Sequence, residues 1–200
     1  KGSCNSFSCR RTPRFASASS VGPCRAFKFA PRCSNVGTSL IPDVPMLISE
    51  APMFELHHRL QADTRILGDL PLCRVLLAKD SQYPWLILVP RVANLREIHH
   101  LAPEQQQQLM QESCAVATLM ERALGPDKIN VAALGNLVPQ LHLHHVARFS
   151  SDAAWPGPIW GACPAIPYEE QALQGAAASW QTRLATLDGF QPFLTDNPVK

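Results

Sequence analysis

The sequence predicts an α+β fold with an antiparallel sheet of about five strands and one long helix. Short apolar segments rich in Val, Ile and Leu are separated by Gly, Pro and Asn, which is typical of strands joined by turns. One longer segment, 103–124, begins at a proline and has apolar residues at helical spacing. Strands and helices do not alternate strictly, and hairpins dominate, which favours an antiparallel sheet.

Residues 1–52 differ in composition from the rest of the chain. They are rich in Ser, Arg, Cys and Pro, and residues 1–42 hold seven Lys or Arg and no Asp or Glu. We expect this segment to be disordered. It resembles an organelle transit peptide, and the alternative is an upstream extension before a start at Met53. The expected compartment is the cytoplasm, or the mitochondrion or plastid if the segment is a transit peptide.

Residues 53–200 carry no signature of a nucleic-acid or membrane protein. They hold eleven basic and fourteen acidic residues, so we expect no nucleic-acid partner. No apolar run approaches the roughly 20 residues that span a bilayer, so no membrane partner is expected. Cys73, Cys114 and Cys163 are widely spaced and form no C-x-x-C pair, which favours reduced thiols in an intracellular protein.

Residues 53–101 are expected to contain two short helical segments and three strands. The helical segments are 54–60 and 94–101, and the strands are 64–67, 72–77 and 85–89. Gly68-Asp69, between the first two strands, is a hairpin signal. The uniformly apolar strand 85–89 should be central and buried on both faces, and Pro90 should end it.

Residues 103–200 are expected to contain the long helix, two further strands and a final helix. The helix 103–124 should end at Gly125, and its predicted apolar stripe includes Leu109, Met110, Cys114 and Met120. The later elements are strands 128–133 and 140–148, helix 168–187 and a turn-like tail, 188–200.

The strand predicted over 140–148 is the candidate functional element. Successive side chains alternate between the two faces of a strand. One face therefore carries Gln140, His142 and His144, whereas the other carries Leu141, Leu143 and His145. Such a polar row either faces water or lines a site.

Three interpretations of His142 and His144 are open from the residues alone. Two histidines at this spacing can ligate zinc, but a zinc site needs at least a third protein ligand, and no motif supplies it. They can also be polar surface. The third interpretation is nucleophilic catalysis, in which one imidazole attacks and its neighbour binds the oxygen of the electrophile.

The segment 130–148 resembles the signature of the histidine triad (HIT) superfamily, His-φ-His-φ-His-φ-φ, where φ is apolar. This chain has the variant Gln-x-His-x-His at 140–144, after Leu-Ile-Leu-Val-Pro at 86–90, a helix, and Lys-Ile-Asn at 128–130, in the order of the family. The resemblance covers roughly residues 54–162 and is to a bacterial-type HIT domain protein. It implies a sheet with one long helix packed on it, a homodimer, and no obligatory metal, so no cofactor is expected.

The resemblance implies a nucleotide hydrolase or nucleotidyl transferase. His142 matches the nucleophile that attacks the α-phosphorus, and His144 matches the histidine that hydrogen-bonds the phosphate. Asn136, with Gly135 before it, lies where the family contacts phosphate, and Asn130 matches an Asn near the phosphates. Asp80 matches the acidic residue that holds the ribose hydroxyls.

Three positions depart from the family pattern. Gln140 replaces the first histidine of the triad and cannot carry a proton charge. Trp85 replaces a histidine, and Leu137 stands where some members have a hydroxyl residue that helps to protonate the leaving group. The candidate substrates are diadenosine polyphosphates and nucleoside phosphoramidates. The alternatives are a catalytically weak nucleotide-binding module and a metal-dependent hydrolase that uses His142 and His144.

The expected organisation is therefore an extension over 1–52, a HIT-like catalytic domain over 53–165, and a C-terminal helix and tail over 166–200.

Overall fold

The computed structural model describes residues 53–193. The predicted extension, 1–52, lies outside the described residues. The helices are α1 (His58–Asp63), α2 (Pro103–Leu124) and α3 (Glu170–Leu184), with a 3₁₀ turn, η1 (Ile98–His100). The strands are β1 (Thr64–Asp69), β2 (Cys73–Ala78), β3 (Trp85–Pro90), β4 (Lys128–Ala133), β5 (Leu143–Arg148) and β6 (Gln191–Pro192).

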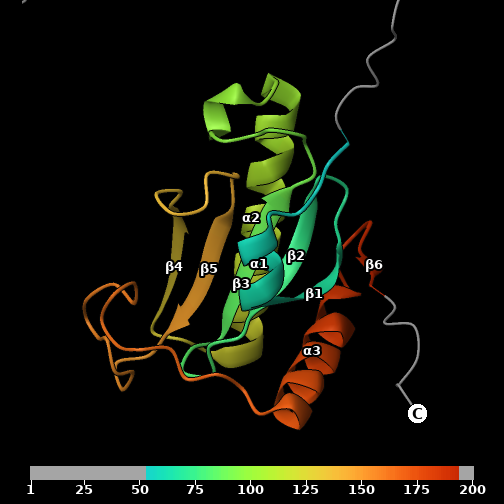
Figure 1. Cartoon of the computed structure of the whole chain (residues 1–200). Helices are drawn as coiled ribbons and strands as arrows, with labels where there is room; N and C mark the ends of the chain where they lie inside the picture. Colours follow the sequence, from blue (N-terminus) through green and yellow to red (C-terminus); the bar gives the residue numbers. More distant parts are fainter. Residues whose placement is uncertain (1–52, 194–200) are drawn as a thin grey trace, which may run out of the picture. The chain divides into compact units, whose positions relative to one another are not determined.

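The strands form one antiparallel sheet in the order β4-β5-β3-β2-β1-β6 (Figure 1). The predicted α+β class is confirmed, with six strands in the described residues instead of about five. The additional strand is β6, a two-residue segment in the tail that was expected to be turn-like. It pairs with β1 through Gly68 and Asp69.

The two faces of the sheet pack against different helices (Figure 1). Val75 and Leu77 of β2 belong to the larger apolar cluster, which also contains residues of α2 and α3. Leu76 and Ala78 belong to a smaller cluster with Leu56, just before α1, and Leu60, within it. Because side chains alternate along a strand, β2 and β3 are buried on both faces, as the apolar run at 85–89 predicts.

Helix α2 has the predicted bounds, but its buried face differs from the predicted stripe. Leu109 and Met120 are buried as expected, whereas Met110 is 56 % exposed and Cys114 is exposed. Glu112 and Ser113 are buried instead. The carboxylate of Glu112 accepts the N–H groups of Leu72 and Cys73 at 2.7 and 2.9 Å, so a polar contact determines which face is buried.

The predicted hairpin turn at Gly68-Asp69 is wrong, because both residues lie within β1 and the turn follows them. A Cβ at Gly68 would lie 2.4 Å from the carbonyl oxygen of Gln191 and 2.5 Å from the ring of Phe190. The glycine is therefore required by the close approach of the C-terminal segment.

Three other predicted boundaries are corrected. The first helix occupies 58–63 instead of 54–60, and only 98–100 of the segment 94–101 is helical. Strand β5 begins at Leu143 instead of Gln140. The alternation of side chains nevertheless extends to residue 141, because Leu141 and Leu143 both lie in the core cluster of α2 and α3.

Candidate active site

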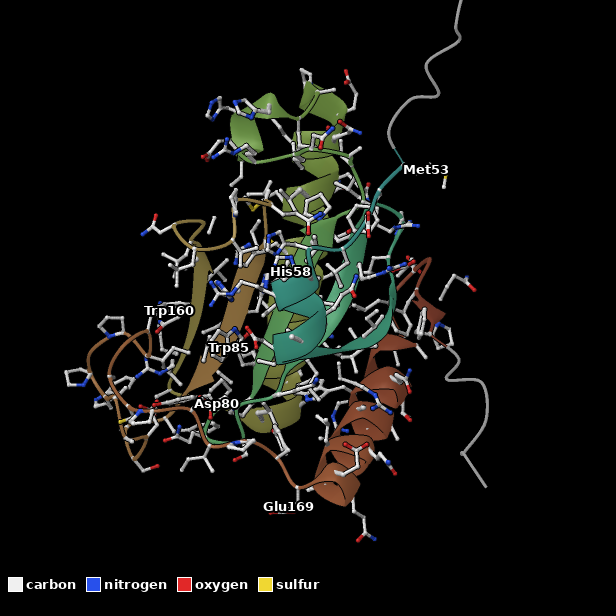
Figure 2. All side chains as sticks on the ribbon, in the orientation of Figure 1. Met53, His58, Asp80, Trp85, Trp160 and Glu169 are labelled. Atoms are coloured by element: carbon white, nitrogen blue, oxygen red, sulfur yellow. The ribbon has the colours of Figure 1, made fainter. Side chains whose placement is uncertain are left out.

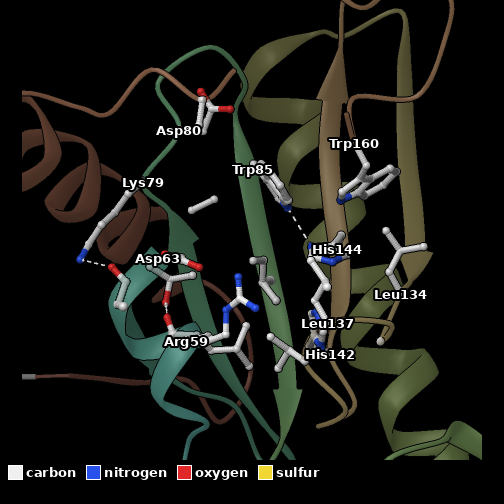
Figure 3. Close-up of a pocket in the computed structure, with 18 of the residues that line it drawn as sticks. Arg59, Asp63, Lys79, Asp80, Trp85, Leu134, Leu137, His142, His144 and Trp160 are labelled. Atoms are coloured by element: carbon white, nitrogen blue, oxygen red, sulfur yellow. Dashed lines mark hydrogen bonds between the residues drawn. The ribbon is translucent and has the colours of Figure 1, made fainter. Parts of the chain in front are cut away.

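A cavity of about 760 Å³ lies on the α1 side of the sheet. His142 and His144 line it together with Trp85 at the start of β3, and α1 contributes residues from 59 to 63 (Figure 3). The two imidazole rings are nearly perpendicular, with centroids 4.8 Å apart. The predicted row of His142 and His144 on one face therefore opens onto a cavity and is not plain polar surface.

His142 is held by the backbone of the residue two positions before it. Nδ1 of His142 lies 2.6 Å from the carbonyl oxygen of Gln140. A carbonyl oxygen can only accept, so Nδ1 carries the proton and donates it. In the neutral ring Nε2 then holds a free lone pair, which is the arrangement that a nucleophilic imidazole requires.

His144 has the opposite tautomer. The indole N–H of Trp85 donates to Nδ1 of His144 at 3.0 Å, and an indole N–H can only donate. Nδ1 of His144 therefore carries the lone pair, and Nε2 of the neutral ring carries the proton. The cavity thus holds one imidazole with a free acceptor nitrogen and one with a free N–H donor.

Burial keeps both rings neutral. Each histidine is 6 % exposed. Desolvation lowers the pKa of His142 below its ordinary value of 6.5, and nearby His57 lowers it further. The hydrogen bond to the Gln140 carbonyl raises this pKa but does not outweigh the desolvation. Desolvation lowers the pKa of His144 to about 3, with smaller contributions from His142 and His145.

The side chain of Gln140 does not line the cavity. Its Oε1 accepts the backbone N–H of His57, and its Nε2 donates to the carbonyl oxygen of Glu55, both at 2.9 Å. Its backbone carbonyl meanwhile holds His142. Gln140 therefore connects the segment that leads into α1 to the residue that holds the candidate nucleophile.

Three of the predicted nucleotide-binding residues line the cavity, and one does not. Gly135, Asn136 and Asp80 line it, and Asp80 lies near Trp85 in the turn before β3 (Figure 2). The carboxylate of Asp80 also accepts the N–H groups of Gln82 and Ile166 at 3.1 and 3.3 Å.

The side chain of Asn130 is hydrogen-bonded to Arg148 and does not reach the cavity. Its Oδ1 accepts a hydrogen bond from Nη1 of Arg148 at 2.7 Å. The guanidinium of Arg148 is also paired with both oxygens of Asp152, through Nε at 2.7 Å and Nη2 at 2.9 Å. Asn130 thus orders the buried Arg148 at the end of β5 and lies outside the cavity lining.

Trp160 and Arg59 are among the cavity residues that the predicted site lacks. Trp160, in the segment after β5, packs edge-on against Trp85 with ring centroids 6.2 Å apart and lies 5.3 Å from His144. The sequence marks Trp160 only weakly, because the Trp, Pro and Gly residues of segment 155–161 fit core packing as well as a nucleotide contact. Arg59 of α1 also lines the cavity, and no motif in the sequence marks it.

Residues 53–193 contain no group of three or more His, Cys, Asp or Glu side chains that could hold a metal ion. In the same range, no helix is both long enough and apolar enough to cross a membrane.

Comparisons with known proteins agree with the geometry. The family model described as HIT domain matches residues 59–151. A search of curated proteins found no match.

The chain is similar to solved structures of three bacterial histidine triad proteins. The protein from Marinobacter aquaeolei VT8 is 54 % identical with a TM-score of 0.66, and the match covers 68 % of this chain and 99 % of that chain. The protein from Bradyrhizobium japonicum is 45 % identical with a TM-score of 0.64, and the match covers 66 % of this chain and 98 % of that chain. The protein from Sinorhizobium meliloti 1021 is 43 % identical with a TM-score of 0.63, and the match covers 66 % of this chain and 97 % of that chain. With this identity over nearly the whole length of these relatives, the chain belongs to the histidine triad (HIT) family.

Proposed function

We propose that this protein hydrolyses or transfers a nucleotidyl group, and that His142 attacks the α-phosphorus of a nucleoside phosphate derivative. Members of the HIT family are generally nucleotide hydrolases or transferases. The observation that carries the proposal is the pair of opposite tautomers in the cavity. The carbonyl of Gln140 leaves Nε2 of His142 free to attack, and the indole of Trp85 leaves Nε2–H of His144 free to donate.

In the first step, the lone pair on Nε2 of His142 forms a bond to phosphorus, and the bond from phosphorus to the leaving group breaks. The leaving group takes the electron pair, and the histidine becomes a cationic nucleotidyl-imidazole. The carbonyl of Gln140, 2.6 Å from Nδ1, stabilises this cation because a hydrogen bond from a charged donor is stronger.

His144 acts on the oxygens that gain charge during the attack. Its Nε2–H donates to a non-bridging phosphate oxygen, and burial keeps this donor neutral and fixed. In the second step, water attacks the same phosphorus and releases a proton to the solvent, the bond from phosphorus to His142 breaks, and the electron pair returns to Nε2. Another nucleophile in place of water gives nucleotidyl transfer.

The loop before β5 supplies further phosphate contacts in this proposal. Within residues 53–193, the backbone N–H groups of Gly135 and Asn136 donate to no protein group, so they are free to bind phosphate oxygens. Asp80 is the proposed ribose contact. Asn130 acts through Arg148 instead of touching the nucleotide, and Gln140 is a positioning residue for His142.

Diadenosine polyphosphates and nucleoside phosphoramidates are both candidate substrates. The alternative function is a nucleotide-binding module with little activity. The observation that favours it is the absence of a proton-carrying side chain at Leu137, which is 75 % exposed beside the cavity, and at Gln140.

A covalent-adduct experiment separates these functions. The protein is incubated with ³²P-labelled nucleotide, quenched in base and tested for an acid-labile protein adduct. We expect the adduct in the wild type and none in His142→Ala. Saturable binding of nucleotide without an adduct supports the binding module. Turnover that is lost on adding a chelator, without an adduct, supports a metal-dependent hydrolase.

We also propose that the protein is a homodimer joined along β4. This strand is at the edge of the sheet, and Val131 within it is 49 % exposed. Met110, on the exposed side of α2, adds a second apolar side chain that a partner could cover. Sedimentation equilibrium that gives the monomer mass at micromolar concentration would rule out a stable dimer.

A further inference from the structure

The two walls of the cavity differ in charge. The sheet wall presents His142, His144 and Trp85, and burial lowers the pKa of both imidazoles so that neither is cationic near neutral pH. A nucleotide with several phosphates brings two or more negative charges. Its charge must therefore be balanced by groups outside the sheet wall.

Of the cationic side chains that line the cavity within residues 53–193, Arg59 on α1 is the one that is free to do this. It is exposed, it lines the cavity, and in Figure 3 its side chain extends from α1 towards β3 and the two histidines. Within residues 53–193 its guanidinium forms neither an ion pair nor a hydrogen bond. A guanidinium presents several N–H donors in a geometry that matches phosphate oxygens.

The other charged residues of the lining are less available for phosphate. The ammonium group of Lys79 donates to the carbonyl oxygen of Ala62 at 2.7 Å, and Figure 3 shows it pointing away from the histidines. Asp80 accepts backbone N–H groups. Asp63 lines the same wall as Arg59, and its negative charge offsets the charge of Arg59 at a distance. Arg59 can therefore attract a phosphate only through direct contact.

The position of Arg59 is coupled to the nucleophile. The backbone N–H of Arg59 donates to Nδ1 of His57 at 3.2 Å, and the backbone N–H of His57 donates to the side chain of Gln140 at 2.9 Å. The carbonyl of Gln140 in turn holds His142. The start of α1 is thus attached through hydrogen bonds to the residue that orients the attacking ring.

We propose that Arg59 binds the phosphate next to the one that His142 attacks, so that the substrates are nucleotides with a phosphate anhydride, such as dinucleoside polyphosphates or nucleoside triphosphates. This inference rests on the proposed function of the same cavity. It selects between the two substrate classes considered above, since a phosphoramidate has no second phosphate for Arg59.

The chemistry of departure supports this choice. When the anhydride bond breaks, the bridging oxygen leaves with the electron pair as part of a phosphate, which needs no protonation near neutral pH. Leu137 and Gln140 can supply no proton, so a leaving group that must be protonated would depart slowly. A guanidinium instead stabilises the charge that develops on the departing phosphate.

The test compares the binding of ATP and AMP in the His142→Ala protein, which cannot consume either ligand through His142. Calorimetry gives the dissociation constants for this protein and for three variants made in it: Arg59→Gln, Arg59→Lys, and the control Arg96→Gln. Arg96 is also exposed but lies outside the cavity lining. Circular dichroism checks that each variant is folded.

Arg59→Gln is expected to weaken ATP binding about tenfold or more and AMP binding less than about threefold, because only ATP has the adjacent phosphates. Arg59→Lys should recover part of the loss for ATP, and Arg96→Gln should change neither ligand. An equal loss for ATP and AMP, or no loss for ATP in the folded Arg59→Gln protein, overturns the proposal.

This result is separable from the proposed function. Selective loss of ATP binding in Arg59→Gln supports the phosphate contact even if the wild type forms no adduct, in which case the proposed chemistry alone fails. An adduct in the wild type together with unselective Arg59 variants keeps the chemistry and removes the contact.

Discussion

His144 and His145 are consecutive residues of β5 that face opposite sides of the sheet. Both are buried, and desolvation lowers the pKa of the first to about 3 and of the second to about 4. His144 lines the cavity and accepts the indole N–H of Trp85, whereas Nε2 of His145 is hydrogen-bonded to the hydroxyl of Ser113 on α2 at 2.7 Å.

The difference between these neighbours separates the histidine that we propose acts on phosphate from a histidine of the core. Burial and a lowered pKa are common to both, so neither identifies the site. Access to the cavity does distinguish them, and so does the hydrogen bond from the indole N–H of Trp85, which fixes the tautomer of His144. Nε2 of His145 is hydrogen-bonded to Ser113 in the core, its Nδ1 has no hydrogen-bond partner within residues 53–193, and His145 does not line the cavity.

Replacement of each histidine by alanine should separate these roles most strongly. His144→Ala should lower kcat about 100- to 1,000-fold, because it removes a donor to the charged phosphate oxygens. His145→Ala should leave kcat per folded molecule nearly unchanged and lower the free energy of unfolding by about 2–4 kcal/mol, since it leaves a cavity and an unpaired Ser113. The measurements are steady-state turnover of diadenosine tetraphosphate and urea unfolding.

A large loss of kcat in folded His145→Ala would show that both faces of β5 contribute to the chemistry. An active His144→Ala protein would remove His144 from the proposed reaction and leave the phosphate to the loop at Gly135 and Asn136.

Trp85→Phe tests the single hydrogen bond that fixes the tautomer of His144. Phenylalanine keeps an aromatic ring against His144 but removes the indole N–H that fixes its tautomer. Both tautomers of His144 then become populated, and kcat should fall about fivefold to tenfold. ¹⁵N chemical shifts of the ring report the tautomer directly, so a change in rate can be matched to its cause.

Trp160→Phe is the matched control. Trp160 also packs against His144, with centroids 5.3 Å apart, but its indole N–H makes no hydrogen bond within residues 53–193. If both variants lose the same activity while the tautomer of His144 is unchanged, the aromatic packing matters and the Trp85 hydrogen bond does not.

The parts of the fold that depend on local signals could be predicted from the sequence. Helix α2 begins at Pro103 and ends before Gly125, which has a positive φ of 58°, and both signals lie within the helix ends themselves. Gly68 was misassigned because the segment that crowds it, Phe190-Gln191, is distant in the sequence. The buried face of α2 was misassigned because Glu112 pairs with backbone groups beyond β1.

The same distinction applies to the site. The placement of His142 and His144 in one cavity follows from the alternation of side chains along an extended chain, which is a local property. The roles of Gln140 and Asn130 depend on distant partners, Glu55 and Arg148, that no spacing rule identifies. Arg59 is a single charge on a short helix, and only the packing of α1 against the sheet brings it to the cavity.

The smallest expected effect is on the pH dependence of stability, and here the two faces of β5 should behave alike. The unfolded chain binds protons at His144 and His145 as the pH falls through the ordinary value of 6.5, whereas the native protein does not until about pH 3 to 4. Stability should therefore be full above pH 6.5 and fall as the pH is lowered, with each histidine contributing at most about 1.4 kcal/mol per pH unit.

His144→Ala and His145→Ala should each flatten this decline between pH 6.5 and 5.0, a window above the ordinary range of the carboxylates. Urea unfolding at three pH values measures the slope for each variant against the wild type. Equal flattening by both variants, beside unequal effects on kcat, would show that burial sets the protonation of these rings while their hydrogen bonds and access set their chemistry. A slope that only His144→Ala reduces would mean that His145 is protonated in the native core. The two histidines would then differ in charge as well as in access to the cavity.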